Sequence, residues 1–258
     1  TVEVSGGEWG TGGIVGWVGE ASIANSSVEG EVFGTDEVGG IIGFSEGGAV
    51  NRSTASATVE GVDYVGGLVG TNYGPIHASS ASGEIVGTEN VGGLAGIHFE
   101  FDDLSESYST SDVTGETAVG GLTGVNAGSM HASYATGNVT GSEAIGGVTG
   151  LNEGTVNETY AAGYVANTTY SGGLVGQNGG DATNGDDGGD GILSNSYWDS
   201  TVTTQSEAVG RQGGDDTDDH EGGQSVVENE VTGLATEQMT GEAASDVMSS
   251  FDFETVWS

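Results

Sequence analysis

Apolar residues recur along this chain with a nearly constant spacing. A block of Gly-Gly, an apolar residue, any residue and Gly begins at seven positions: Gly12, Gly39, Gly66, Gly92, Gly120, Gly146 and Gly172. The steps between successive blocks are 27, 27, 26, 28, 26 and 26 residues. A period of this length is typical of repeat proteins, in which each unit stacks on its neighbours to build a continuous core.

Each repeat contains three short segments that have the composition of β-strands. In the fifth repeat they span residues 120–126, 129–136 and 138–140, are rich in Val, Thr and Tyr, and end at Gly or Asn. None has the length or the 3.6-residue period of a helix. The sequence therefore predicts an all-β fold, a right-handed parallel β-helix (β-solenoid) of about seven coils of 26–28 residues. A β-propeller is disfavoured, because its blades need four strands and about 40 residues.

Equivalent residues of successive repeats should form columns along the solenoid, about 4.8 Å apart. One expected apolar column is Val38, Val65, Val91, Val119 and Ile145, and a second is Ile14, Ile41, Leu68, Leu94, Leu122, Val148 and Leu174. A tyrosine column comprises Tyr108, Tyr134, Tyr160 and Tyr197, and a turn column comprises Asn72, Asn126, Asn152 and Asn178. Stacked rings and stacked amides can interact from coil to coil. The paired glycines suit a corner that needs positive φ or the absence of a Cβ.

The repeat continues to about residue 210 and then dissolves. We expect residues 1–210 to form the solenoid, with an insertion loop at 179–191, and residues 211–258 to form an acidic loop and a C-terminal cap. Thr240 is a candidate N-cap for a short helix through Met248 within this cap. A solenoid needs its terminal coils covered, and Trp9 could cover the other end or form a joint to another subunit.

Charge and composition limit the partners and the environment. The chain has 52 Gly, 1 Pro and no Cys, and it carries 39 acidic residues against two arginines and no lysine. This acidic excess predicts adaptation to high salt, where a Debye length of about 3 Å screens the self-repulsion. Nucleic acid and anionic lipid are excluded as partners, since no basic patch can form. No apolar run is long enough to span a membrane, and no signal peptide is visible, as expected for a mature or excised chain.

Several segments resemble the GLUG-motif repeat family. Its Gly-Leu-apolar-Gly mark stands at residues 67–70 and 173–176, and its Ser-Tyr-Ala-Thr-Gly segment at 133–137. The runs at 195–199 (NSYWD), 233–239 (GLATEQM) and the terminal FDFETVW are similar to the usual end of such arrays. The resemblance covers about 245 residues and implies a secreted or surface-attached, adhesin-like protein. It transfers no site residues.

Calcium is the best-supported candidate ligand. Asp186 and Asp190 alternate with glycines in the insertion loop, although this loop lacks the middle oxygen donor of a calcium-binding loop and has Tyr197 where that motif has Glu. A solvated acidic loop that binds no metal is the favoured interpretation of this segment. His77 and His131 share a column but should lie two coils apart, about 10 Å, which is too far for one metal ion.

Five Asn-x-Ser/Thr sequences are candidate glycosylation sites: Asn25, Asn51, Asn138, Asn157 and Asn167. Their use would require an exported protein. Asn25, Asn51 and Asn157 are expected near one strand edge.

These observations favour an extracellular structural or adhesive surface protein that is not an enzyme. It could bind a surface partner or a glycan, or associate end to end as a subunit of a filament or appendage, since the ends of a solenoid expose strand edges. The alternatives are a glycan-active β-helix lyase or hydrolase, and a carbohydrate-binding or virion-fibre module on the same scaffold. Paired carboxylates do not identify an active site in a chain this acidic.

The acidic excess gives a first testable prediction. The chain should unfold cooperatively in molar NaCl or KCl and should lose its structure on dialysis to low salt, because carboxylate repulsion is then unscreened. Circular dichroism across a salt series measures this. Equal folding at about 50 mM salt without divalent ions would contradict the halophilic interpretation.

Overall fold

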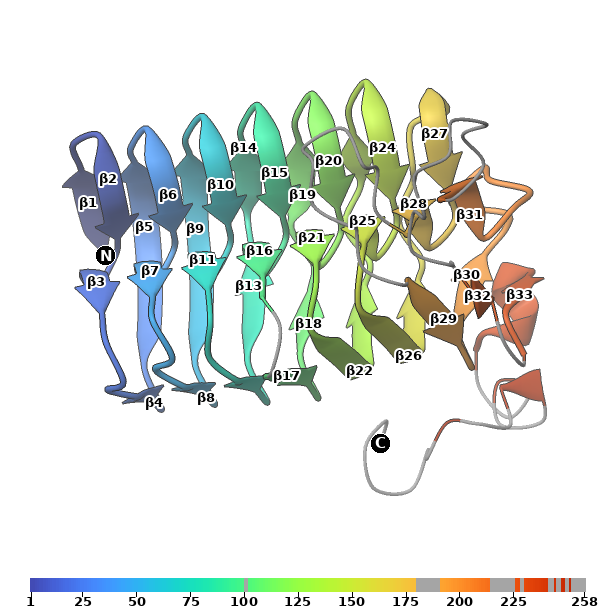
Figure 1. The fold of residues 1–258 in the computed structure, drawn as a ribbon, viewed down its shortest axis with the longest axis horizontal. Coiled ribbons are helices and arrows are strands. Elements are labelled where there is room, and N and C mark those ends of the chain that lie inside the picture. The colour runs from blue at the N-terminus through green and yellow to red at the C-terminus, as the bar shows by residue number, and fades with distance from the viewer. Residues whose placement is uncertain are drawn as a thin grey trace, which may run out of the picture.

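A computed structural model describes residues 1–99, 102–179, 191–213, 226–227, 230–240, 244, 247–248 and 251, and it shows an all-β parallel solenoid (Figure 1). Three sheets run along the axis, and every strand pairs in parallel with its equivalent in the next coil. The fold class predicted from the repeat is confirmed. Among the described residues the shortest sheet has seven strands, which define six steps, so the solenoid makes about six turns rather than seven.

Sheets B and C lie toward the viewer in Figure 1. Sheet B contains β2 (Trp9–Gly12), β6 (Asp36–Gly39), β10 (Asp63–Gly66), β15 (Glu89–Gly92), β20 (Thr117–Gly120), β24 (Glu143–Gly146) and β27 (Thr169–Gly172). Sheet C contains β3 (Val15–Val18), β7 (Ile42–Ser45), β11 (Val69–Asn72), β16 (Ala95–His98), β21 (Thr123–Asn126), β25 (Thr149–Asn152), β28 (Val175–Asn178) and β31 (Val209–Gln212).

Sheet A forms the opposite side of each coil. Its strands are β1 (Val2–Ser5), β4 (Ile23–Ala24), β5 (Ser27–Phe33), β8 (Val50–Asn51), β9 (Thr54–Glu60), β12 (Ile76–His77), β13 (Ser80–Ser82), β14 (Glu84–Val86), β17 (Asp103–Ser105), β18 (Tyr108–Ser109), β19 (Asp112–Thr114), β22 (Ser129–Ala135), β23 (Val139–Thr140), β26 (Thr155–Ala161), β29 (Ile192–Ser194), β30 (Tyr197–Asp199), β32 (Val226–Val227) and β33 (Thr232–Leu234). A 3₁₀ turn spans Thr236–Gln238. In the described residues no helix is long and apolar enough to cross a membrane.

The Gly-Gly pair is a corner between two sheets and not the start of a strand. Its first glycine ends a strand of sheet B, and a strand of sheet C begins two residues after its second. The predicted first segment, 120–126, is therefore divided between β20 and β21, and the expected polar bend before the next pair is β24. The backbone amides at each corner are hydrogen-bonded to the next coil, where one carbonyl oxygen accepts from two of them. For example, the Leu68 oxygen accepts from the Ile41 and Ile42 nitrogens.

Close packing, and not positive φ, explains the paired glycines. No described Gly-Gly corner has a positive φ. A Cβ at Gly67 would overlap the carbonyl oxygen of Gly93 and lie 2.7 Å from the Cβ of Ala81. Opposite the corners, sheet A presents a column of small residues, Ala55, Ala81, Ser109, Ala135 and Ala161. The coil is thus pinched where the corner meets sheet A.

The pinch divides the core into two parallel clusters. Val38, before one Gly-Gly pair, belongs to one cluster, and Ile41, after it, belongs to the other. On the opposite side Ala55 and Ala57 divide in the same way. The predicted valine and leucine columns are therefore both interior but line different cores. Ile14 is the exception in its column: it is 48% exposed in the first coil, while its equivalents are buried.

Two further columns hold left-handed backbone, which the sequence did not reveal. In sheet B it comprises Gly10, Glu37, Tyr64, Asn90, Ala118, Ala144 and Tyr170, with φ between 53° and 61°. At the other corner it comprises Asn25, Arg52, Ala78, Glu106, Ala132, Glu158 and Asn195, with φ between 46° and 50°. The third glycine of each block backs onto the first of these columns: a Cβ at Gly70 would lie 2.5 Å from the Glu37 carbonyl carbon.

A buried serine ladder follows the second left-handed column. The backbone nitrogen of Ser53 donates to the Ser79 hydroxyl (3.1 Å), and that of Ser79 donates to the Ser107 hydroxyl (3.1 Å). Each hydroxyl also donates to the carbonyl two residues earlier, as Ser79 does to His77 (2.9 Å). These bonds satisfy the backbone at a corner where the coil reverses direction.

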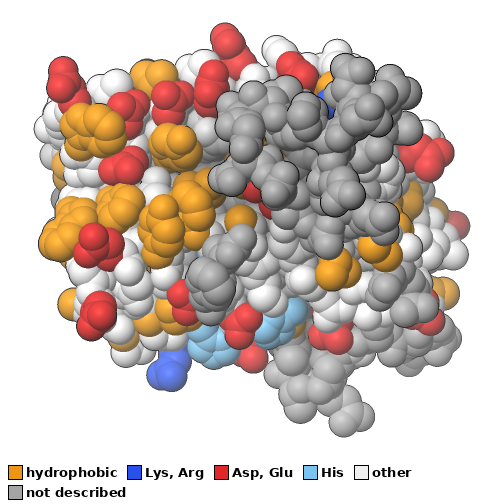
Figure 2. Space-filling view, in the orientation of Figure 1, with side chains coloured by type: hydrophobic (Ala, Val, Ile, Leu, Met, Phe, Trp, Pro, Cys, Tyr) orange, Lys and Arg blue, Asp and Glu red, His pale blue; other side chains and the backbone are white. Residues whose placement is uncertain are grey.

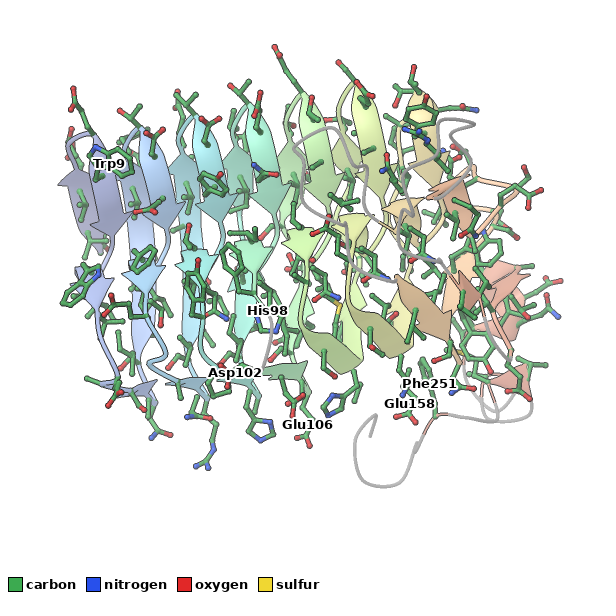
Figure 3. All side chains as sticks on the ribbon, viewed as in Figure 1. Trp9, His98, Asp102, Glu106, Glu158 and Phe251 are labelled. Atoms are coloured by element: carbon green, nitrogen blue, oxygen red, sulfur yellow. The ribbon has the colours of Figure 1, made fainter. Side chains whose placement is uncertain are left out.

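The predicted asparagine column forms a real hydrogen-bond ladder. Asn126 donates to the Asn152 amide oxygen (2.9 Å), and Asn152 donates to Asn178 (2.7 Å). His98 interrupts this ladder, and it is fully buried (Figure 3). Its Nδ1 accepts from Asn72 (2.9 Å), so its Nε2 carries the proton that faces the Asp102 carbonyl (3.0 Å). His98 cannot also donate to the Asn126 amide oxygen, which has no partner among the described residues.

The last coils are closed by larger side chains. Trp198 occupies the small-residue column after Ala161, fills the pinch against Gly173, and donates to the Gln205 carbonyl (3.0 Å). Beside it, Tyr197 packs with Leu234, Ala244, Met248 and Phe251. Ala244 and Val247 are helical, and the Met248 nitrogen donates to the Ala244 carbonyl (2.8 Å), as the predicted short helix requires. Phe253 and Trp257 lie outside the described residues.

The close packing at the corners predicts that a methyl group added there lowers the free energy of unfolding, whereas one added at an open glycine does not. Gly67→Ala should lower the free energy of unfolding by about 2 kcal/mol or more, because the new Cβ overlaps backbone that cannot move aside. Gly7→Ala is the matched control, since no atom lies within 4 Å of its added Cβ. Denaturant unfolding in molar salt measures both. Equal stability of the two variants would show that the corners are not close-packed.

His98 predicts a pH dependence that one variant should remove. Burial lowers the pKa of His98 from 6.5 to about 4, so between these values the unfolded chain binds a proton that the folded chain does not. Stability is therefore full above pH 6.5 and falls as the pH drops toward 4, by roughly 3 kcal/mol for this residue. The His98→Asn variant should not show this loss of stability between pH 6.5 and 4, and its amide should extend the asparagine ladder. Parallel pH profiles of unfolding for the two proteins would contradict this account.

Candidate functional site

Exposed aromatic residues gather over the N-terminal coils of sheets B and C. Figure 2 shows hydrophobic side chains gathered on the left of this side of the molecule, with acidic side chains between them. We define the aromatic face as Trp9, Trp17, Phe44, Tyr64, Tyr73 and Phe99. Trp9 and Trp17 are 73% and 58% exposed. A cluster of exposed rings of this kind is a candidate interaction surface.

Two outward columns of sheet C supply four of these rings. Trp17 and Phe44 are register partners on β3 and β7. Tyr73 and Phe99 follow β11 and β16 in the next two coils, and their rings stack with centroids 4.1 Å apart and planes 4° apart. Phe44 meets Tyr73 at 5.8 Å with a tilt of 50°. The rings thus form a continuous row along the solenoid axis.

Sheet B adds Trp9 and Tyr64 beside this row. Figure 3 shows Trp9 on β2. The sequence left open whether Trp9 covers the end of the first coil; its side chain is exposed, so it does not cover that end. Tyr64 has φ 55° in the left-handed column. In a bulky residue this conformation is strained by about 1 kcal/mol or more, whereas Gly and Asn adopt it more readily. Tyr170 has the same backbone conformation in the last strand of sheet B, with φ 56°.

Carboxylates surround the rings. Burial first, and then Glu37 and Tyr64, raises the pKa of Tyr73, which places these three side chains together across the boundary of the two sheets. Burial first, and then Asp63, Glu89, Glu37 and Asp36, raises the pKa of Tyr64. The Trp17 ring and the Glu46 carboxylate both approach Gly19, at 3.8 and 4.0 Å from its Cβ position. The face therefore combines flat apolar rings with hydrogen-bond acceptors.

Cationic groups are scarce on the whole molecule. Arg52 follows β8 at the corner with sheet A, and Arg211 lies in β31 over the Tyr170 ring, 4.9 Å from its centroid. Neither belongs to the aromatic face. Within the described residues no three His, Cys, Asp or Glu side chains are grouped to hold one metal ion. The predicted calcium ligands Asp186 and Asp190 lie outside the described residues, so that site stays a prediction.

The histidine column has the spacing predicted from the repeat. His77 and His131 are separated by Ser105 in consecutive registers, which places them two coils apart. His77 Nδ1 contacts the Ser105 hydroxyl (3.2 Å), and its Nε2 lies 3.8 Å from a Glu106 oxygen. The buried His98 was not singled out by sequence reasoning. The only available signal was its position in the register of the asparagine column.

The candidate glycosylation sites differ in accessibility. Asn25, Asn138 and Asn167 are exposed, whereas Asn51 and Asn157 are half-buried. Asn51 and Asn157 share one column of sheet A, and Asn25 follows the register partner of Asn51, as expected. The Asn157 amide oxygen accepts from Ser194 (3.0 Å) and Asn195 (2.8 Å). Their modification remains a prediction.

Comparison with known proteins supports the repeat assignment over part of the chain. Residues 7–32 match the family model described as the GLUG motif. This segment is one repeat long and contains Trp9, the first Gly-Gly corner and Trp17. No match was found to a curated protein or to a solved structure.

Proposed function

We propose that this chain is an exported structural and adhesive surface module, built for concentrated salt, and not an enzyme. The observation that carries the proposal is the aromatic face on a rigid repetitive scaffold. Each Gly-Gly corner between sheets B and C is close-packed and hydrogen-bonded to the next coil. The strands that carry the six rings therefore have fixed relative positions. Adhesion through many modest contacts needs such a preorganised surface.

The acidic composition supports an extracellular location in brine. With 39 acidic residues, two arginines and no lysine, the surface would repel itself strongly at ordinary ionic strength. The GLUG match over residues 7–32 supports the same interpretation, since the family resemblance implies surface-attached repeat proteins.

End-to-end assembly into a filament is a second candidate, favoured by one observation. Among the described residues, β1, β2, β3 and β4 each pair with a single neighbouring strand. Ile14, at the same end, is 48% exposed although its column is otherwise buried. A strand or coil added here would complete both the hydrogen bonds and the core.

Immunogold electron microscopy of intact cells that produce the protein tests the proposal. We expect label on the outer surface without lysis, in dispersed patches for an adhesin and in lines along appendages for a filament subunit. Cells that lack the gene are the control. Label that appears only after lysis would overturn the proposed location. Release of reducing ends from a glycan by the purified chain would overturn the non-enzymatic role.

A further inference from the structure

The aromatic face specifies a class of ligand, and this inference deepens the adhesive role proposed above and rests on it. We infer that the aromatic face binds a linear, neutral polysaccharide laid along the solenoid axis, with sugar rings packed against Trp17, Phe44 and the ridge of Tyr73. Two observations support it: the shape of the row and the chemistry around it.

The row has the shape of a polymer track. Its members come from consecutive coils, which rise about 4.8 Å each, a step comparable to the length of one pyranose unit in an extended glycan. Tyr73 and Phe99 stack face to face, with parallel planes and centroids 4.1 Å apart, so their edges form one ridge. Trp17 and Phe44 continue the row toward the first coil. The same outward column continues as Thr71, Ile97, Val125, Leu151 and Gln177, without aromatic residues.

The surroundings select hydroxyl groups over charged ones. Glu37, Glu46 and Asp63 flank the rings, and carboxylates accept hydrogen bonds from sugar hydroxyls without donating any. An anionic polysaccharide would meet these carboxylates with no cation on the face to offset the repulsion. A neutral chain supplies apolar ring faces to the aromatics and hydroxyls to the acids, and it matches both.

Titration calorimetry in molar NaCl tests the inference with the whole chain. The probes are a soluble neutral glucan, a soluble neutral mannan and, as the charged comparison, polygalacturonate. We expect at least one neutral polymer to bind and polygalacturonate not to bind. Trp17→Ala and Tyr73→Ala should each weaken binding about tenfold, the loss of one central stacking contact.

Tyr108→Ala is the matched control. Tyr108 is 38% exposed and stacks on Tyr134 at 5.0 Å, much as Tyr73 is 39% exposed and stacks on Phe99, but it lies on sheet A. Its variant should bind within about twofold of the parent. Circular dichroism establishes that all three variants are folded.

Three results would overturn the inference. They are binding of polygalacturonate as tight as that of the neutral polymers, equal losses in the Tyr73 and Tyr108 variants, and no binding of either neutral polymer. Sedimentation of the same samples tests whether a second copy of the chain covers the face instead. If the chain binds no glycan but self-associates, and Tyr73→Ala abolishes the self-association, the face is an interface between copies. Surface label together with any of these results would leave the adhesive role standing and remove only the glycan.

Discussion

Close approach of backbone to backbone at the glycine corners is the constraint on which the rest of this solenoid depends. The first glycine faces the carbonyl three residues on, the second meets the small-residue column of sheet A, and the third rests on left-handed backbone of the preceding coil. None of these sites has room for a Cβ. The pinched cross-section that results divides the apolar interior into two narrow cores, which are filled mainly by Val, Ile, Leu and Ala, and by Trp198 in the last coils.

The columns could be predicted because the repeat length is nearly constant. Val38, Val65 and Val91 share a register as expected, and Tyr108, Tyr134 and Tyr160 stack about 5 Å apart. The division of each repeat into strands could not be predicted in the same way. The alternation of inward and outward side chains is interrupted where a residue such as Glu37 or Ala118 has a left-handed backbone. Neither side chain favours positive φ, so the sequence does not predict this conformation.

The aromatic face was hidden from sequence reasoning for a different reason. Trp17 and Phe44 share one column, Tyr73 and Phe99 share another, and Tyr64 sits on a different sheet, so no single periodic position collects them. They meet only because the Gly-Gly corner brings sheets B and C side by side. A repeat analysis finds residues that recur, whereas the six residues of the aromatic face do not recur at one position of the repeat.

The same separation of inward and outward positions bears on the proposal that this acidic solenoid binds a partner in concentrated salt. At about 1 M salt the Debye length is near 3 Å, so exposed carboxylates contribute little attraction or repulsion beyond direct contact. Stacking and hydrogen bonds act at contact and are not screened in this way. A surface that works under those conditions has to gather rings and acceptors at fixed spacing, and the glycine-locked coils of residues 9–99 provide that spacing.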